Sequence, residues 1–404
     1  MSAAADIAVY RGIRYATADR FGAPVRVDGA PIWSDEPGPI APQLPSRLET
    51  VMGKPNQLPQ SEDCLRLTIT APKQATGRPV LIWIHGGAYL TGSGGFDWYD
   101  AGTLVRETGI VVVSINYRLG ALGYLRAPGR ASGNLGLLDQ ITAIEWVRDH
   151  IAEFGGDPQS LTVAGQSAGA HSIFAMLGSP RTRGLFRRAI LQSVPTGIAF
   201  PTPAQAERVG QIFLDVLGTD PHSAPLSEIL RAQGETARQF AEPDGLSLPF
   251  LPISGLDPLP EADAWRAEIR DRAADLRLVV GSTAHEMAAF LGPDPTAELA
   301  QSLGREIFEE PLAEFADDLA RAGAHLHRYR VDALHPDNPF GACHCIELPL
   351  LFGDENAWGT APMLSGLPLD TLADLGAPMR RAWGEFVTTG VIADWEGAQP
   401  HRLP

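Results

Sequence analysis

The chain has 404 residues, 44% of them hydrophobic and 20% charged, which is typical of a globular protein with enough apolar material for a large α/β domain. Its formal net charge of −16 argues against nucleic acid and membrane surfaces as partners and favours a neutral or cationic small-molecule substrate. Three cysteines are too few, and odd in number, for a disulfide framework, which favours a cytoplasmic location.

The N-terminal part of the chain is expected to form the edge of a sheet. It lacks a basic segment followed by a long apolar one, so we expect no signal peptide, and no run approaches the ~18 apolar residues of a membrane span. The first seventy residues are rich in Pro and Gly and contain short β-like pieces such as "RLTITAP". These pieces predict antiparallel strands.

Two near-continuous apolar runs follow, and they predict central strands buried on both faces. The first is "RPVLIWIHGG" (78–87) and the second is "IVVVSINYR" (110–118). Between residues 135 and 154, apolar residues recur at a helical period until a Gly-Gly pair ends the pattern. The segment predicts a long helix packed on the sheet.

The rest of the chain continues this alternation of strands and helices. Short strands are predicted at 160–164, 186–193, 276–283 and 325–332, and a C-terminal helix is predicted to end at Gly390. Alternation of this kind predicts an α/β fold, in which helices cover both faces of a central, mostly parallel twisted sheet. Residues 195–260 lack strand runs, and we interpret them as a helical lid or substrate-pocket insertion within a single domain spanning 1–404.

The stretch "SLTVAGQSAGAHSIFAM" predicts a strand, a tight turn and a helix, with Ser167 at the turn. Only the four residues 165–168 are left for the reversal of the chain. In this setting G-x-S-x-G lifts the serine hydroxyl above the sheet edge at the helix N-terminus. Small residues could instead serve only close packing of the helix, but the flanking strand and helix favour Ser167 as a nucleophile.

A serine nucleophile also needs donors for an oxyanion, and "HGGAYLTGSGG" supplies a suitable loop after a central strand. We expect the backbone amides of Gly87, Ala88 and Ala168 to form the oxyanion hole. An ordinary Gly-rich connection is the alternative; a phosphate loop is disfavoured because its Lys and Ser/Thr are missing.

The wall of the substrate pocket is expected to include residues beside these groups. We expect Gly86, Tyr89 and Gln166 to line it, and Trp98 and the "KPNQLPQ" loop (54–60) to form its alcohol side.

Several motifs together resemble the type B carboxylesterase family, which includes bacterial para-nitrobenzyl esterases and cholinesterases. They are "SEDCLRLTITAP", "PVLIWIHGGAYLTG", "VVVSINYRLGALGYL", "GNLGLLDQITAIEWVRDHIAEFGGDPQSLTVAGQSAGAHS" and "FRRAILQS", with two later islands, "GSTAHEMAAF" and "GACHCIELPLLFG". The resemblance implies the α/β-hydrolase fold. It also implies hydrolysis of carboxylic esters, without metal or cofactor, through an acyl-enzyme and a Ser-His-Glu triad.

By this resemblance the catalytic base is His344. The chain has ten histidines, and chain order favours a late one, because in this fold the base follows the nucleophile and the acid. Four other histidines also lie late in the chain, of which two begin a predicted strand and one lies in the tail: His325, His327, His335 and His401.

The resemblance maps the acid onto Glu286, which follows the predicted strand 276–283. A surface glutamate at the start of a helix is the alternative. As the acid, Glu286 would orient the imidazole of His344 and stabilise the imidazolium. Ser193 matches a family serine that supports the acid, so we expect it beside Glu286.

Other functions fit parts of the sequence. The "CHC" run at 343–345 suggests zinc, but an extended segment would place its cysteines on one side and His344 on the other. The same catalytic machinery could hydrolyse an amide, a carbamate or a lactone. A non-catalytic binding protein is a remote alternative, because all three triad positions are filled. The sequence does not define an oligomeric state or the natural substrate.

Overall fold

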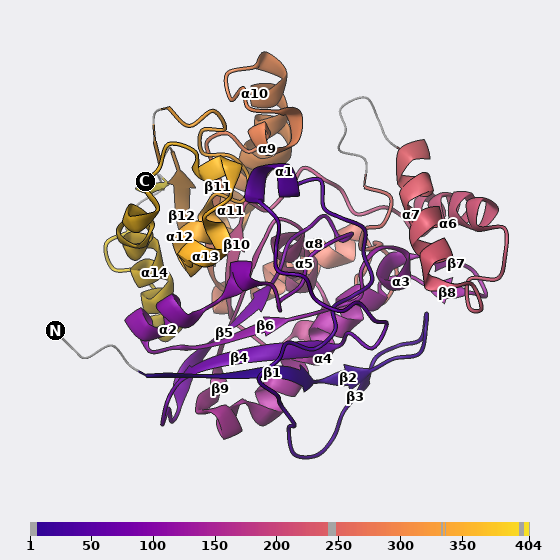
Figure 1. Cartoon of the computed structure of the whole chain (residues 1–404), viewed down its shortest axis with the longest axis horizontal. Helices are drawn as coiled ribbons and strands as arrows, with labels where there is room; N and C mark the ends of the chain where they lie inside the picture. The colour runs from indigo at the N-terminus through magenta and orange to yellow at the C-terminus, as the bar shows by residue number, and fades with distance from the viewer. Residues whose placement is uncertain (1–5, 241–247, 333, 336, 396–399, 404) are drawn as a thin grey trace.

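The computed structural model describes residues 6–240, 248–332, 334–335, 337–395 and 400–403, and a nine-stranded sheet forms its centre (Figure 1). The first three strands across the sheet pair antiparallel, and all later pairs of strands are parallel, which confirms the predicted mostly parallel sheet. In spatial order the strands are β1 (Ile7–Arg14), β4 (Arg66–Pro72), β6 (Val111–Ile115), β5 (Arg78–Ile84), β9 (Gly156–Gln166), β10 (Arg188–Gln192), β11 (Arg277–Thr283), β12 (His325–Val331) and β13 (His401–Leu403).

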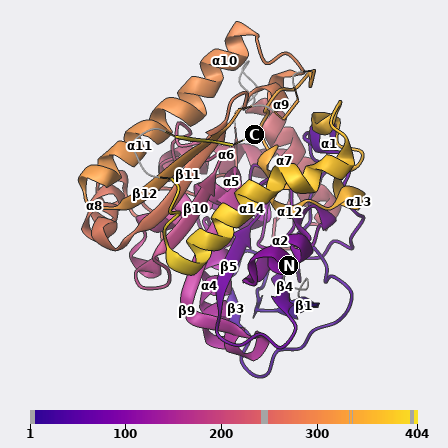
Figure 2. The ribbon, with the colours of Figure 1, turned by 90° about the vertical axis from the view of Figure 1, so that its left-hand side faces the viewer.

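Both faces of the sheet are buried. Successive side chains of a strand point to opposite faces, so Ile82 on β5 belongs to one core and Trp83 to the other. Figure 2 shows α14 on one side of the sheet and α8 and α11 on the other. The first core is covered by α4 (Leu135–His150), α5 (Ala168–Leu177), α8 (Ala262–Arg272) and α11 (Glu310–Arg321), the second by α2 (Gly102–Thr108), α12 (Glu347–Phe352) and α14 (Leu372–Thr389).

Most of the predicted elements are present, with shifted ends. The predicted helix 135–154 is α4 followed by a 3₁₀ turn that ends at Gly155, and α14 ends at Gly390 as expected. Strand β13 was not predicted, because three residues carry no readable periodicity. Within the described ranges, the structure contains no helix with the length and apolarity that crossing a bilayer requires.

Residues 195–260 carry two helices, α6 (Pro203–Leu217) and α7 (Leu226–Gln239), which pack against each other; residues 241–247 lie outside the described residues. The amide oxygen of Gln233 on α7 accepts a hydrogen bond from the backbone N–H of Ala121, at 3.0 Å. This contact anchors α7 to the short helix α3 (Gly120–Tyr124). The lid function of the insertion and the single-domain division of 1–404 stay predictions.

Candidate active site

Ser167 lies in a strained turn between β9 and α5. Its backbone has φ 56° and ψ −122°, a conformation that costs about 1–3 kcal/mol in a non-glycine residue. The turn is held because the N–H of Ser167 donates to the carbonyl of Gln192 on β10, at 2.9 Å. Helix α5 begins so close to β5 that a Cβ on Gly169 would lie 2.0 Å from the carbonyl oxygen of Ile84. The sequence therefore places a hydroxyl at the carboxyl edge of the sheet, where this hydrogen bond and the close approach of Gly169 to Ile84 hold the turn.

His344 and Glu286 meet although 58 residues separate them. Nδ1 of His344 lies 2.5 Å from Oε2 of Glu286, and both side chains are fully enclosed. The other carboxylate oxygen accepts from the N–H of Thr283, the last residue of β11, at 2.8 Å. The N–H of His285 donates to the carbonyl of Ala342, so the two loops pair locally like adjacent strands. The carboxylate fixes the His344 tautomer with its proton on Nδ1 and leaves Nε2 as an acceptor.

The Nε2 atom of His344 already has a hydrogen-bond partner, Gln166, the residue before Ser167. The amide nitrogen of Gln166 lies 3.1 Å from it and donates, because Nε2 carries the lone pair. Among the described residues the hydroxyl of Ser167 makes no hydrogen bond. The rings of Phe290 and Phe308 lie 5.1 and 5.2 Å from the imidazole and shield it from water. For proton transfer, the serine hydroxyl therefore has to replace the Gln166 amide at Nε2, a tightening that apo sites commonly require.

The predicted oxyanion loop is a tight turn in which successive residues have positive φ. Gly87 has φ 110° and Ala88 φ 57°, and the Gly87 carbonyl closes the turn by accepting from the N–H groups of Leu90 and Thr91. A Cβ on Gly87 would lie 2.1 Å from the Thr91 carbonyl oxygen, so only glycine fits. Within the described chain, the N–H groups of Gly87, Ala88 and Ala168 donate to no protein acceptor. Three such free donors can bind an oxyanion, and losing one typically costs about 3–4 kcal/mol of transition-state stabilisation.

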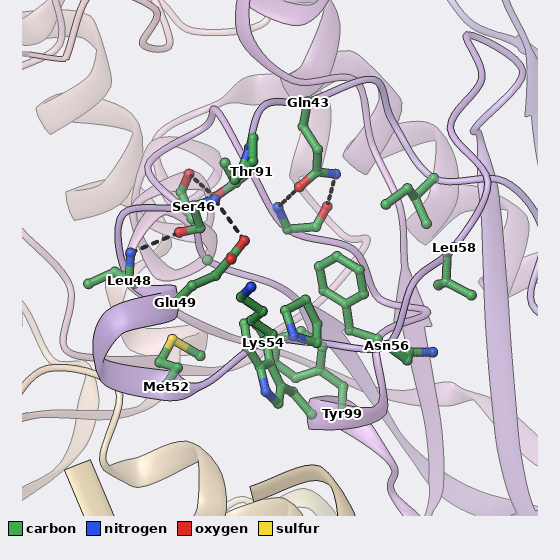
Figure 3. A pocket seen from close by; sticks show the side chains of 18 of the residues that line it. Gln43, Ser46, Leu48, Glu49, Met52, Lys54, Asn56, Leu58, Thr91 and Tyr99 are labelled. Atoms are coloured by element: carbon green, nitrogen blue, oxygen red, sulfur yellow. Dashed lines mark hydrogen bonds between the residues drawn. The ribbon is translucent and has the colours of Figure 1, made fainter. Parts of the chain in front are cut away.

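A cavity of about 200 Å³ opens beside Ser167 (Figure 3). Gly86 and Gln166, two of the residues expected in the substrate pocket, line this cavity, and so do Trp98 and residues 54–58 and 60. The segment that precedes β4 forms most of the wall. The apolar residues that line the cavity are Ile40, Leu44, Pro45, Leu48, Met52, Pro55, Leu58, Phe96, Trp98, Tyr99 and Leu348. No described residue of 195–260 lines this cavity, so the predicted insertion does not form this wall.

The prediction that Tyr89 lines the pocket is wrong. Its φ of 61°, after the left-handed Ala88, turns the ring into the core, where it is 1% exposed. The Tyr89 hydroxyl donates to Nδ1 of His171 on α5, at 3.1 Å, and Nε2 of His171 lies 3.1 Å from the Ile198 carbonyl. Tyr89 therefore anchors the oxyanion loop to α5 and to the chain that follows β10.

Two buried neutral histidines near this loop make stability depend on pH. Burial lowers the pKa of His85 and of His171 from 6.5 to about 4. Both groups bind protons in the unfolded chain before they do so in the folded one, so their contribution is full above pH 6.5 and is lost as the pH falls towards 4. We expect each to remove about 2 kcal/mol from the free energy of unfolding between pH 7.5 and 5. Urea unfolding at pH 7.5 and at pH 5 measures this decrease in the free energy of unfolding. In H171Q the contribution of the two histidines to the decrease should be about half as large. An unchanged decrease in that variant would contradict the assignment.

Ser193 supports a different carboxyl group from the one predicted. Its hydroxyl donates to Oε2 of Glu347, at 2.7 Å, and not to Glu286. The hydroxyl of Tyr329 on β12 donates to the other oxygen of Glu347. Burial, and then the charge of Glu286, raise the pKa of Glu347 to about 8. Sequence reasoning missed Glu347; its signal was a carboxyl group three residues after His344 within an otherwise apolar run.

The "CHC" run and the other late histidines were the remaining candidates in the sequence. Across the described ranges, no three His, Cys, Asp or Glu side chains gather closely enough to bind a metal ion. Cys343 and Cys345 are buried free thiols whose pKa values are raised by burial, and Cys345 donates to the Gln166 amide oxygen. His327 lies on β12 against the Trp395 carbonyl.

Comparisons with known proteins agree with the geometry. The model of a family described as the carboxylesterase family matches residues 1–298. A probable N-octanoylanthranilate hydrolase of Rhodococcus erythropolis is 52% identical, over 96% of this chain and 90% of that protein. The para-nitrobenzyl esterase of Bacillus subtilis (strain 168) is 34% identical, over 94% of this chain and 86% of that one. A solved thermophilic para-nitrobenzyl esterase superposes with a TM-score of 0.83 at 31% identity, over 95% of this chain and 88% of its own.

Proposed function

Because the chain belongs to the carboxylesterase family, a family of carboxylic ester hydrolases with the α/β-hydrolase fold, we propose that it hydrolyses its ester at Ser167 with His344 as base and Glu286 as acid. The single observation that carries this assignment is the buried contact between Glu286 and Nδ1 of His344. It leaves Nε2 unprotonated beside the turn that displays the serine, as a general base requires.

The proposed reaction has two halves. The Ser167 oxygen attacks the acyl carbon while His344 takes its proton, and the amides of Gly87, Ala88 and Ala168 bind the oxyanion. The C–O bond of the ester then breaks, and the alcohol leaves with the proton from His344. In the second half, water donates a proton to His344, attacks the acyl-enzyme and releases the carboxylic acid and free Ser167. The reaction needs no metal or cofactor.

A fluorophosphonate serine-hydrolase probe tests this proposal directly. We expect one adduct on Ser167 by peptide mass spectrometry, abolished in S167A and formed much more slowly in H344A, because the probe requires an activated serine. Circular dichroism of each variant serves as the folding control. An adduct on another serine, or none on folded wild-type protein, would contradict the assignment and favour a binding protein.

Amide hydrolysis by the same residues is the second candidate function. The observation that favours it is the 52% identity to a protein named as a probable N-octanoylanthranilate hydrolase, since that substrate is an amide. Such a substrate joins an eight-carbon acyl chain to an aromatic amine that carries a carboxylate. Comparing the turnover of octanoyl anilides with that of the matching phenyl esters distinguishes the two activities.

Cys64, Cys343 and Cys345 are free and buried, which supports a cytoplasmic location for either activity.

A further inference from the structure

The wall of the active-site cavity carries one cation. Of the described residues that line the cavity, only Glu49 and Lys54 are charged. Both belong to the segment around helix α1 (Glu49–Met52), and Figure 3 draws both among the lining side chains. Every other lining residue is apolar, a glycine or an uncharged polar residue.

The two charges differ in what they already bind. The Glu49 carboxylate accepts from the backbone N–H of Ser46, at 3.1 Å, and so already binds the turn that precedes its own helix. The Lys54 ammonium forms no ion pair or hydrogen bond with any residue in the described part of the chain. The chain's other lysine, Lys73, pairs with Asp6 on the protein surface. Lys54 is therefore a positive charge without an ion-pair partner among the described residues, at the wall of a cavity that polar and apolar side chains line together.

We propose that Lys54 binds a carboxylate on the leaving group of the substrate, so that the preferred substrates are acylated aromatic alcohols or amines that carry an acid group. This inference rests on the proposed hydrolysis at Ser167. The apolar wall, which includes Phe96, Trp98 and Tyr99, suits an aromatic ring, and the ammonium supplies the one charge that an arene carboxylate needs.

The net charge of −16 points the other way, toward neutral or cationic substrates, but it acts over longer distances. Lys54 is exposed, and at physiological ionic strength exposed charges more than about 8 Å apart are largely screened, whereas an ammonium and a carboxylate in contact lie well within that distance. Close to the bound leaving group, Lys54 therefore outweighs the distributed negative charge. The carboxylate keeps its charge during the reaction, so the contact strengthens substrate and transition state alike and is expected in KM more than in kcat.

The test compares phenyl octanoate with the octanoyl esters of 2-, 3- and 4-hydroxybenzoate in wild-type protein, K54M, K54R and K73M. For each carboxylate ester, kcat/KM is divided by kcat/KM for phenyl octanoate. For at least one of the three isomers, we expect this ratio to be about tenfold or more lower in K54M than in wild type, mainly because KM rises. K54R should retain most of the ratio, and K73M should match wild type. Because each variant is compared on the same pair of esters, differences in leaving-group reactivity cancel.

The outcomes separate the two proposals. Turnover of phenyl octanoate with a ratio that K54M leaves unchanged would overturn the role of Lys54 while the proposed esterase stands. An equal fall in K73M would also overturn it, because the effect would then come from overall charge. A fall in K54M that raised salt reproduces in wild type would support a screened ion pair. Absence of both ester turnover and probe labelling of Ser167 would instead overturn the proposed function.

Discussion

Replacing Ser167 by alanine is expected to lower kcat for ester hydrolysis by about 10⁴- to 10⁶-fold, with little change in KM. The variant keeps the oxyanion amides and the cavity, so substrate still binds, but the acyl-enzyme cannot form. The left-handed backbone at this position is equally accessible to alanine, so the fold should survive. Steady-state kinetics measure kcat and KM. S193A is the control variant, because Ser193 is a buried serine that donates to Glu347.

The same experiment extends to the base. H344A should lose about as much activity as S167A, and the double variant should lose no more than either single one, because the two residues act as one unit. Losses that multiplied in the double variant would show that Ser167 and His344 work independently, and the proposed triad would be wrong.

The sheet and the turn that carries Ser167 could be predicted from the sequence because their signals are local. Apolar runs such as 110–118 mark strands buried on both faces, and a serine among small residues between a strand and a helix marks a displayed hydroxyl. The structure brings Ser167, Glu286 and His344 to the same edge of the sheet, because β9, β11 and β12 run parallel and so end on one side.

Side-chain directions and long-range partners could not be predicted. Tyr89 turns inward because three successive residues, Gly87 to Tyr89, adopt positive φ, which no sequence period reveals. Ser193 finds Glu347, 154 residues away, because β10 and the start of α12 meet only in the folded core. The bond between Gln166 and His344 likewise depends on the placing of a loop that carries no pattern of its own. Resemblance transferred residue types to positions but not the hydrogen bonds between them.

Replacing Glu286 by glutamine is expected to lower kcat by about 10³- to 10⁴-fold, because the imidazole would adopt the wrong tautomer. The backbone N–H of Thr283 donates to one carboxylate oxygen, so the glutamine carbonyl would stay there and its NH₂ group would face Nδ1 of His344. Nδ1 would then have to accept, and the proton would move to Nε2. A protonated Nε2 cannot take the proton of Ser167.

The chain offers a matched control in its second buried glutamate, Glu347. Burial and the charge of Glu286 raise its pKa to about 8, so at pH 7 it is mostly protonated and an uncharged glutamine resembles its working state. We expect E347Q to change kcat by less than about tenfold, while E286Q removes nearly all activity. Steady-state kinetics at pH 7, with fluorophosphonate labelling rates as a second readout, compare the two variants. A larger loss in E347Q than in E286Q would assign the role of the acid to Glu347. Both carboxyl groups are buried, and only the one that binds Nδ1 of His344 can set the tautomer of the imidazole.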